Sequence, residues 1–211
     1  MRNLISVLPI ILLLTVFMSS GVAEAKVNSD KRIVSNFSSL QISGALDVKV
    51  NFGSESSVEI FSPNNVTNVI TEVEDGELKV YQKGNSSYEG KIEVIIYTSN
   101  LYSANLSGAS KLKIEKLNTE NFSLDLSGAS KITLDGNVTN LNLNVSGASN
   151  LELSDLNVTN AIIEFSGAST GKVNVSGDLS VSLSGASVLK YSGNPIIKSE
   201  KISGVSKLQK L

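Results

Sequence analysis

The motif Ser-Gly-Ala-Ser recurs along this chain, and its spacing constrains the fold more than any other feature of the sequence. Consecutive copies begin 20, 19, 20, 18 and 19 residues apart, and the last copy reads SGVS. Such a repeat is too short for a propeller blade but long enough for one turn of a β-solenoid, because a strand advances about 3.3 Å per residue. The first two residues of the six copies are Ser107 and Gly108, Ser127 and Gly128, Ser146 and Gly147, Ser166 and Gly167, Ser184 and Gly185, and Ser203 and Gly204.

Apolar and polar residues alternate on both sides of each copy. Apolar residues stand one, three and five positions before most copies, and five and seven positions after them. An alternation with a period of two indicates β-strands with one buried face. The residues five positions before the first five copies, which this pattern points inward, are Tyr102, Phe122, Leu141, Ala161 and Leu179.

These patterns predict an all-β fold, a parallel β-helix or β-solenoid of about 18–20 residues per coil. Each coil would consist of a strand, the motif, a second strand and a polar connection. Equivalent strands of successive coils would stack about 4.8 Å apart. The regular coils are expected from about residue 101 to residue 211, with a less regular part before them.

The motif itself is interpreted as a structural corner between two strands. Glycine adopts a positive φ at little cost, and alanine is small enough for a tight bend. The stacked serines are expected to form columns of hydroxyl groups that bond to one another or to the neighbouring backbone. A serine nucleophile would need a base, and the chain contains no histidine. A flexible Gly/Ser linker would lack the alternating apolar residues on both sides.

The N-terminal third repeats less clearly. A near copy of the motif, SGAL at 43–46, is followed by Val48 and Val50 at the usual positions. The interval from Ser43 to Ser107 corresponds to about three further turns with irregular corners. Within it, EVEDGELKV predicts a hairpin across Asp75-Gly76. The alternative is that this third leaves the solenoid path and serves as an N-terminal cap.

The last coil departs from the pattern in a different way. Glu200 and Lys198 stand three and five positions before Ser203, where the other coils carry apolar residues. The final strand of a solenoid is otherwise unpaired at its edge and needs polar capping. These charges therefore indicate an end coil.

Residues 1–25 are predicted to be a cleavable signal peptide. Arg2 precedes an apolar run from Leu4 to Phe17, and Ala23-Glu24-Ala25 has the form of a cleavage site. Residues 26–211 would then form one exported domain in the periplasm, at the cell surface or outside the cell. The chain has no cysteine, so a lipoprotein is not expected. No later stretch is apolar over enough residues to span a membrane.

Composition argues against several functions. The net charge is −2, and it stays −2 without Arg2 and Glu24, whereas a nucleic-acid-binding protein carries a basic face. Histidine, the commonest metal ligand and general base, is absent, and we expect no cofactor or metal. The carboxylates of the coils are spread over different repeat positions, whereas a polysaccharide-acting β-helix enzyme needs them clustered in a cleft.

Lys111 and Lys131 are the candidate binding residues. Each directly follows a motif, so the two side chains would stack in adjacent coils, with Glu115 and Asp135 nearby. Such a pair is suited to contact an acidic glycan, although charged residues more often form a solvated face. The many N-x-S/T triplets are attributed to the Asn- and Ser-rich composition.

The order of motifs resembles a known family. The pattern R-x-V-x-x-F-x-x-L-x-I-S-G-A-L-D-V-x-V from Arg32 to Val50, followed by serial SGAS coils, is similar to the "putative auto-transporter adhesin, head GIN domain" family. This is a domain family of unknown function that is common in Bacteroidetes, and the resemblance covers nearly all of residues 32–210. It implies a right-handed parallel β-helix-like fold. It supplies no site residues.

We therefore expect an exported, non-catalytic β-solenoid that acts as an adhesin-like or envelope binding module for a glycan or an envelope protein. The alternative is a purely structural, self-associating envelope scaffold. A polysaccharide-acting enzyme is the least supported interpretation. The ligand and the oligomeric state stay open at this level.

Overall fold

Alternating apolar side chains place most of the described chain in β-strands. The computed structural model describes residues 27–63, 65–84 and 90–211, so the predicted signal peptide at 1–25 lies outside the described residues. The elements are β1 (Asn28–Ile33), β2 (Ser39–Gly44), β3 (Asp47–Phe52), β4 (Ser57–Ser62), the 3-10 turn η1 (Val66–Asn68), β5 (Val69–Glu74), β6 (Glu77–Gln82), β7 (Glu93–Thr98), β8 (Ser103–Gly108), β9 (Lys111–Gly128), β10 (Lys131–Gly147), β11 (Asn150–Gly167), β12 (Thr170–Val175), β13 (Asp178–Gly185), β14 (Val188–Ser192), β15 (Ile196–Ile202) and β16 (Lys207–Lys210).

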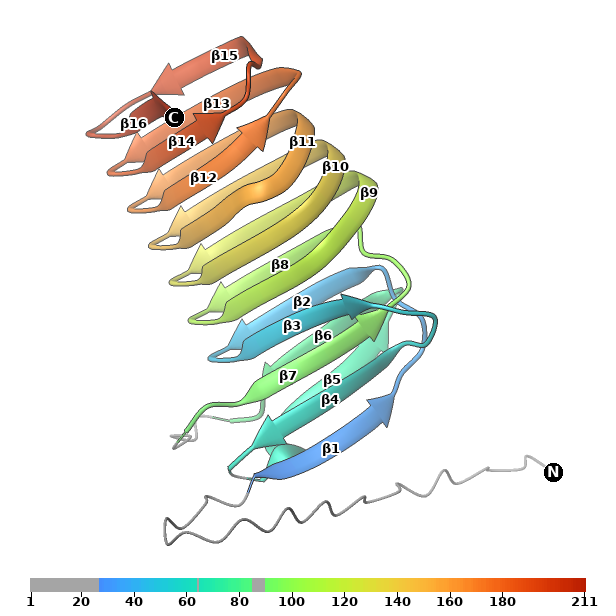
Figure 1. Cartoon of the computed structure of the whole chain (residues 1–211). Coiled ribbons are helices and arrows are strands. Elements are labelled where there is room, and N and C mark those ends of the chain that lie inside the picture. Colours follow the sequence, from blue (N-terminus) through green and yellow to red (C-terminus); the bar gives the residue numbers. More distant parts are fainter. Residues whose placement is uncertain (1–26, 64, 85–89) are drawn as a thin grey trace, which may run out of the picture.

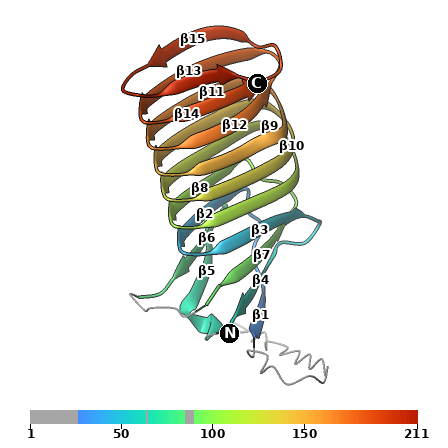
Figure 2. The same ribbon diagram turned by 60° about the vertical axis from the view of Figure 1, so that its left-hand side comes forward.

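The strands stack as two layers of a solenoid (Figures 1 and 2). One layer has the order β1-β4-β7-β3-β9-β10-β11-β12-β14-β16, and the other follows β5-β6-β2-β8-β9-β10-β11-β13-β15. The long strands β9, β10 and β11 belong to both layers because each continues around the bend between them. All pairs from β8 onward are parallel. The predicted fold class, an all-β solenoid of stacked parallel coils, is confirmed.

The core lies between the two layers and runs along the solenoid axis. Residues at the predicted inward positions, such as Leu143, Leu153 and Ile163, are at most 1% exposed. They form one continuous apolar cluster from Phe37 to Leu189. Burying one such side chain contributes about 1.5–3 kcal/mol, so the repeated inward positions supply the main stabilising free energy.

The motif glycines stack directly on one another at the corners. All six have a positive φ, between 70° and 133°. In each coil the amide of the next residue donates to the carbonyl of the glycine below, as from Ala148 N to Gly128 O at 2.8 Å. A Cβ atom built on Gly147 would lie 2.2 Å from Gly128 O. Glycine is therefore required here both by the backbone conformation and by the close approach of the coils.

The second serine of the motif is buried and connects neighbouring coils. Ser149 Oγ accepts from Ser130 N at 3.1 Å and donates to Gly128 O at 3.3 Å. Ser169 and Ser187 repeat this arrangement. The first serine is less buried, and its hydroxyl donates to a carbonyl of the preceding coil, as from Ser146 to Leu126 at 3.2 Å. The hydroxyls of Ser146, Ser149, Ser169 and Ser187 therefore bond to the backbone and not to one another.

One of the two expectations, three further turns between Ser43 and Ser107, is wrong. β2 pairs directly with β8, with Gly44 opposite Gly108. The intervening chain leaves the solenoid, forms β4 and the β5–β6 hairpin, and adds one coil, β6 and β7, on the far side of β2 and β3. β1 and β4 then continue the β7 layer in antiparallel pairing. This part forms the N-terminal cap that was the alternative expectation.

The predicted hairpin across Asp75-Gly76 is confirmed. β5 and β6 pair antiparallel, with Glu74 opposite Glu77. Both turn residues have a positive φ, 50° for Asp75 and 77° for Gly76. This is the type I′ geometry that matches the twist of a two-residue hairpin.

The last described coil consists of β15 and β16, which pair with β13 and β14 respectively. Glu200 lies opposite the buried Val181, at an inward position, yet it is exposed. A register shift after Leu179 places Ile197, not Lys198, at the next inward position. The predicted charged coil at 196–210 is therefore present, but the register shift moves Lys198 away from the inward position that the sequence predicted for it.

We predict that Gly147→Ala destabilises the protein by at least about 2 kcal/mol, because the substitution adds strain at a positive φ and a clash with Gly128 O. Gly53→Ala is the matched control, since its added Cβ would meet no atom within 4 Å. Urea unfolding followed by circular dichroism measures both. Equal midpoints for the two variants would contradict the role assigned to the corner.

We predict a contrast between two serines of the same column. Ser149→Ala leaves the buried Ser130 N–H without its partner and should cost about 1–3 kcal/mol. Ser130→Ala should leave stability unchanged or raise it, because Ser130 Oγ is buried with no hydrogen-bond partner among the described residues. The same unfolding measurement separates them, and a larger loss for Ser130→Ala would refute the assignment.

Candidate binding site

The two outer faces of the solenoid differ in chemistry. The lysine face consists of the outward side chains of β3, residues 111–115, 131–135 and 150–154, and of β12 and β14. The asparagine face consists of the outward side chains of β8, residues 121–127, 140–146 and 160–166, and of β13. Each outward position forms a row across the strands, because the coils stack in register.

Lys111 and Lys131 lie side by side on the lysine face. They are partners in the β9–β10 register, and both are exposed. Lys111 Nζ is 3.9 Å from Asp47 Oδ2, which also pairs with Lys91 at 2.8 Å. Lys131 makes no ion pair within the described residues.

The two acids expected near this pair are engaged elsewhere. Glu115 pairs with Lys113 at 2.7 Å and with Lys49 at 2.8 Å. Asp135 accepts a hydrogen bond from the backbone N–H of Lys116 at 2.7 Å. Glu115 therefore pairs with other lysines of this face, and Asp135 neutralises no lysine because its partner is a backbone N–H.

The ion pairs of this face shift the pKa values of their acids. Hydrogen bonds from Lys113 and Lys49 lower the pKa of Glu115 to about 2. Lys172, at 2.8 Å, and then Ser154 lower the pKa of Glu152. Both carboxylates therefore stay ionised over the whole neutral range.

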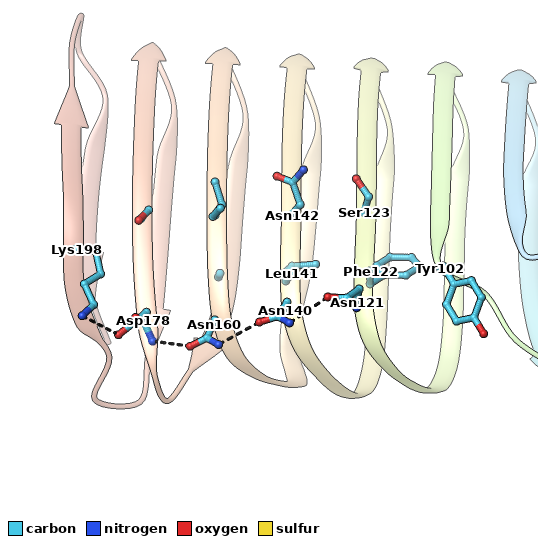
Figure 3. Close-up of a pocket in the computed structure, with 13 residues that line it drawn as sticks. Tyr102, Asn121, Phe122, Ser123, Asn140, Leu141, Asn142, Asn160, Asp178 and Lys198 are labelled. Atoms are coloured by element: carbon cyan, nitrogen blue, oxygen red, sulfur yellow. Dashed lines mark hydrogen bonds and ion pairs between the residues drawn. The ribbon is translucent and has the colours of Figure 1, made fainter.

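A ladder of asparagine amides crosses the asparagine face at its edge (Figure 3). Asn140 Nδ2 donates to Asn121 Oδ1 at 3.0 Å, and Asn160 Nδ2 donates to Asn140 Oδ1 at 3.0 Å. The backbone N–H of Asp178 donates to Asn160 Oδ1 at 3.1 Å, and Lys198 Nζ lies 3.5 Å from Asp178 Oδ1. The ladder therefore links five coils without a break.

The ladder has a direction. Every donor lies one coil closer to the C-terminus than its acceptor, so the bonds polarise one another in the same sense. At the other end, Asn121 Nδ2 has no acceptor within the part of the chain that the structure describes. This end of the ladder therefore presents a free amide donor to the surface.

Tyr102 is not the inward residue that the alternation predicts. Its side chain is 51% exposed, whereas the preceding Leu101 is 1% exposed and fills the core. Tyr102 Oη accepts a hydrogen bond from Asn100 Nδ2 at 2.9 Å. The other four residues of that inward series, Phe122, Leu141, Ala161 and Leu179, are at most 3% exposed.

The ladder and Tyr102 border one groove on the asparagine face, and Figure 3 shows Tyr102 at the end of the row. The groove encloses about 550 Å³ and is also lined by Ser123, Asn142 and the 55% exposed Ile162. Neither the ladder nor the groove was foreseen. The signal in the sequence was the polar stretch NVTN, which recurs at 137–140 and 157–160.

A second ladder lies on the curved edge between the layers. Asn157 Nδ2 donates to Asn137 Oδ1 at 3.1 Å, and Asn174 Nδ2 donates to Asn157 Oδ1 at 3.2 Å. A hollow of about 250 Å³ beside it is lined almost entirely by Asn, Thr and Ser side chains. No aromatic ring borders this hollow, so it offers hydrogen bonds alone.

Other kinds of site receive little support from the geometry. Asp125 and Glu164 share a row of the asparagine face but are separated by the intervening coil of Asn144. In the described ranges no three acidic residues gather in a way that could hold a metal ion. Nor does any helix there have the length and apolar character needed to cross a bilayer.

Comparison with known proteins places the chain among proteins described as adhesins. The profile of the family described as "Putative auto-transporter adhesin, head GIN domain" matches residues 36–195. A crystal structure described as a "putative adhesin" from Bacteroides fragilis NCTC 9343 superposes with a TM-score of 0.73 at 18% identity, over 89% of this chain and 98% of that chain. Another, a "putative adhesin" from Parabacteroides merdae ATCC 43184, gives a TM-score of 0.50 at 15% identity, over 88% and 96%. At these identities the likeness shows the fold. No curated protein sequence matches the chain significantly.

We predict that the Glu115 carboxylate titrates with a midpoint near pH 2, well below its ordinary pKa of 4.5. Because the folded pKa is depressed, the contribution of Glu115 to stability is fully present above about pH 4.5 and is lost as the pH falls through about 2. Carbon-detected NMR titration of the side chain measures this. The double variant Lys49→Gln, Lys113→Gln should move the midpoint back toward 4.5, and a wild-type midpoint already at 4.5 would contradict the pairing.

Proposed function

This chain belongs to the "putative auto-transporter adhesin, head GIN domain" family, and from that premise we propose that it is an exported, non-catalytic, adhesin-like binding module of the cell envelope. The observation that carries this proposal is the groove of about 550 Å³ that crosses several coils of the asparagine face. Its volume lies within the range of sites that hold small molecules or short oligomers.

Export is part of the proposal. The charged start, apolar run and Ala-Glu-Ala sequence within residues 1–25 are typical of a secretory signal. A folded β-solenoid of residues 26–211 would then be released to the periplasm, the cell surface or the medium. With no cysteine in the sequence, lipid attachment through cysteine is not part of this proposal.

The distribution of titratable groups supports binding over catalysis. Catalysis on polysaccharides needs paired carboxylates in one cleft. The groove borders Asp178 alone among the acids, and this residue is paired with Lys198. The sequence also lacks histidine as a general base. The groove is therefore suited to hold a ligand without transforming it.

Lys111 and Lys131 form the second proposed contact. Their stacked side chains would favour an acidic glycan or an acidic protein surface. Neighbouring ion pairs reduce the charge of this face, and the hollow beside Lys111 measures only about 160 Å³. We therefore rank this pair below the groove.

A structural scaffold is the second candidate function, and one observation favours it. β15 and β16 each pair with a neighbour on one side only in the described chain. Ile196 is 61% exposed there and Val205 is 74% exposed. Open strand edges with apolar side chains are suited to end-to-end association of two copies.

The test is adhesion of purified residues 26–211, coupled to fluorescent beads, to surfaces that carry neutral glycans, acidic glycans or fibrous proteins. We expect attachment that resists flow on at least one surface class and is competed by soluble protein. Beads carrying an unrelated β-solenoid serve as the control. Absence of attachment to every class, together with concentration-dependent self-association in analytical ultracentrifugation, would replace the binding module with the scaffold.

A further inference from the structure

We propose that the groove on the asparagine face binds a neutral oligosaccharide, with Tyr102 as the stacking platform and the amides of Asn121, Asn140 and Asn160 as the hydrogen-bonding edge. This inference rests on the proposed binding function and names its ligand class. The groove, the exposed ring and the ladder meet at one place on the solenoid (Figure 3).

Tyr102 supplies the apolar contact. Its ring is 51% exposed although Leu101 is available to fill the core, so the tyrosine leaves the inward row at this coil. Its hydroxyl accepts a hydrogen bond from Asn100 Nδ2 at 2.9 Å. A tyrosine side chain has only two rotatable bonds, so it loses little entropy on binding. The C–H face of a pyranose ring packs on such a surface, while the tyrosine O–H remains free to donate.

The ladder supplies the polar contacts. Each amide has two N–H donors and a carbonyl oxygen, and the ladder uses at most one donor of each. Within the described chain, Asn140 and Asn160 each keep one N–H without an acceptor, and Asn121 keeps both. These donors are available to a ligand. Neighbouring amides are separated by the coil spacing of about 4.8 Å. This repeat is comparable to the length of one sugar unit in an extended glycan chain.

The charges select a neutral ligand. Among the groove residues only Asp178 and Lys198 are charged, and they lie 3.5 Å apart and pair with each other. The remaining lining is made of amides, hydroxyls and a few apolar side chains. An acidic glycan would find no unpaired cation in this groove, and a cationic ligand would find no unpaired acid.

The direction of the groove disfavours a peptide. An extended peptide that binds a sheet by strand addition needs an open edge with unpaired backbone groups. The groove instead runs across β9, β10, β11 and β13, whose backbone groups are bonded to neighbouring coils. A ligand here must therefore be recognised by side chains, as hydroxyl-rich sugar rings are.

The test measures binding of residues 26–211 to an array of neutral oligosaccharides of hexoses, N-acetylhexosamines and pentoses, printed beside acidic glycans, with titration calorimetry on the strongest ligand. We expect Tyr102→Ala to weaken binding about tenfold, ~1.4 kcal/mol, and Asn121→Ala to weaken it severalfold. Tyr102→Phe should keep most of the affinity, because the ring provides the stacking. Both positions, Tyr102 and Asn121, are exposed, so circular dichroism suffices to check folding.

Matched controls separate this site from the rest of the surface. Asn157→Ala removes an amide of the second ladder, and Lys113→Gln removes a charge of the lysine face, so both should leave the affinity unchanged. Neutral-glycan binding that Tyr102→Ala does not weaken would overturn the site. Binding restricted to acidic glycans and lost in Lys111→Gln, Lys131→Gln would overturn the ligand class but keep the binding module. If the protein binds no glycan but the beads still adhere to protein surfaces, the ligand class is overturned and the binding module is kept.

Discussion

The stacking of each motif glycine on the glycine of the preceding coil is the constraint on which the rest of this structure depends. At these corners the amide of the next residue donates to the lower glycine carbonyl at 2.7–2.9 Å. No side chain fits into that contact, since a Cβ on Gly147 would lie 2.2 Å from Gly128 O. Because side chains alternate with a period of two, a slip of one residue would turn every inward residue outward. The corner therefore sets the register of both layers.

That register also creates the surface chemistry. In-register coils place like residues one above another, so asparagines about twenty residues apart in sequence become hydrogen-bonded neighbours. The two faces then diverge through their outward residues. Acids and lysines pair on one face and reduce its field, whereas amides, hydroxyls and an exposed tyrosine form a groove on the other. A fold made of identical corners thus presents two different surfaces, and the variable outward positions carry the binding function that we propose.

Individual positions show how far the sequence can be trusted. The alternation correctly predicted buried residues such as Leu143 and Ile163. The turn-forming pair Asp75-Gly76 correctly predicted the hairpin of β5 and β6. The prediction that Tyr102 points inward was wrong, because Leu101 and Tyr102 are adjacent apolar residues. Which of the two enters the core depends on the packing of the neighbouring coils. The interval before Ser107 was also misread in part, because a coil added on the far side of β2 and β3 leaves no periodic mark along the chain. The candidate groove was missed altogether.

The sequence by itself determined the length of the coil, the place of each corner and most of the inward side chains. These are properties of single coils, governed by backbone sterics at glycine and by the burial of every second residue. Only the tertiary structure decided the stacking order of the N-terminal coils, the burial of the second motif serine, and the union of distant asparagines and Tyr102 in one groove. These features depend on which coil lies beside which, and strands about 4.8 Å apart join residues that the chain itself keeps far from one another.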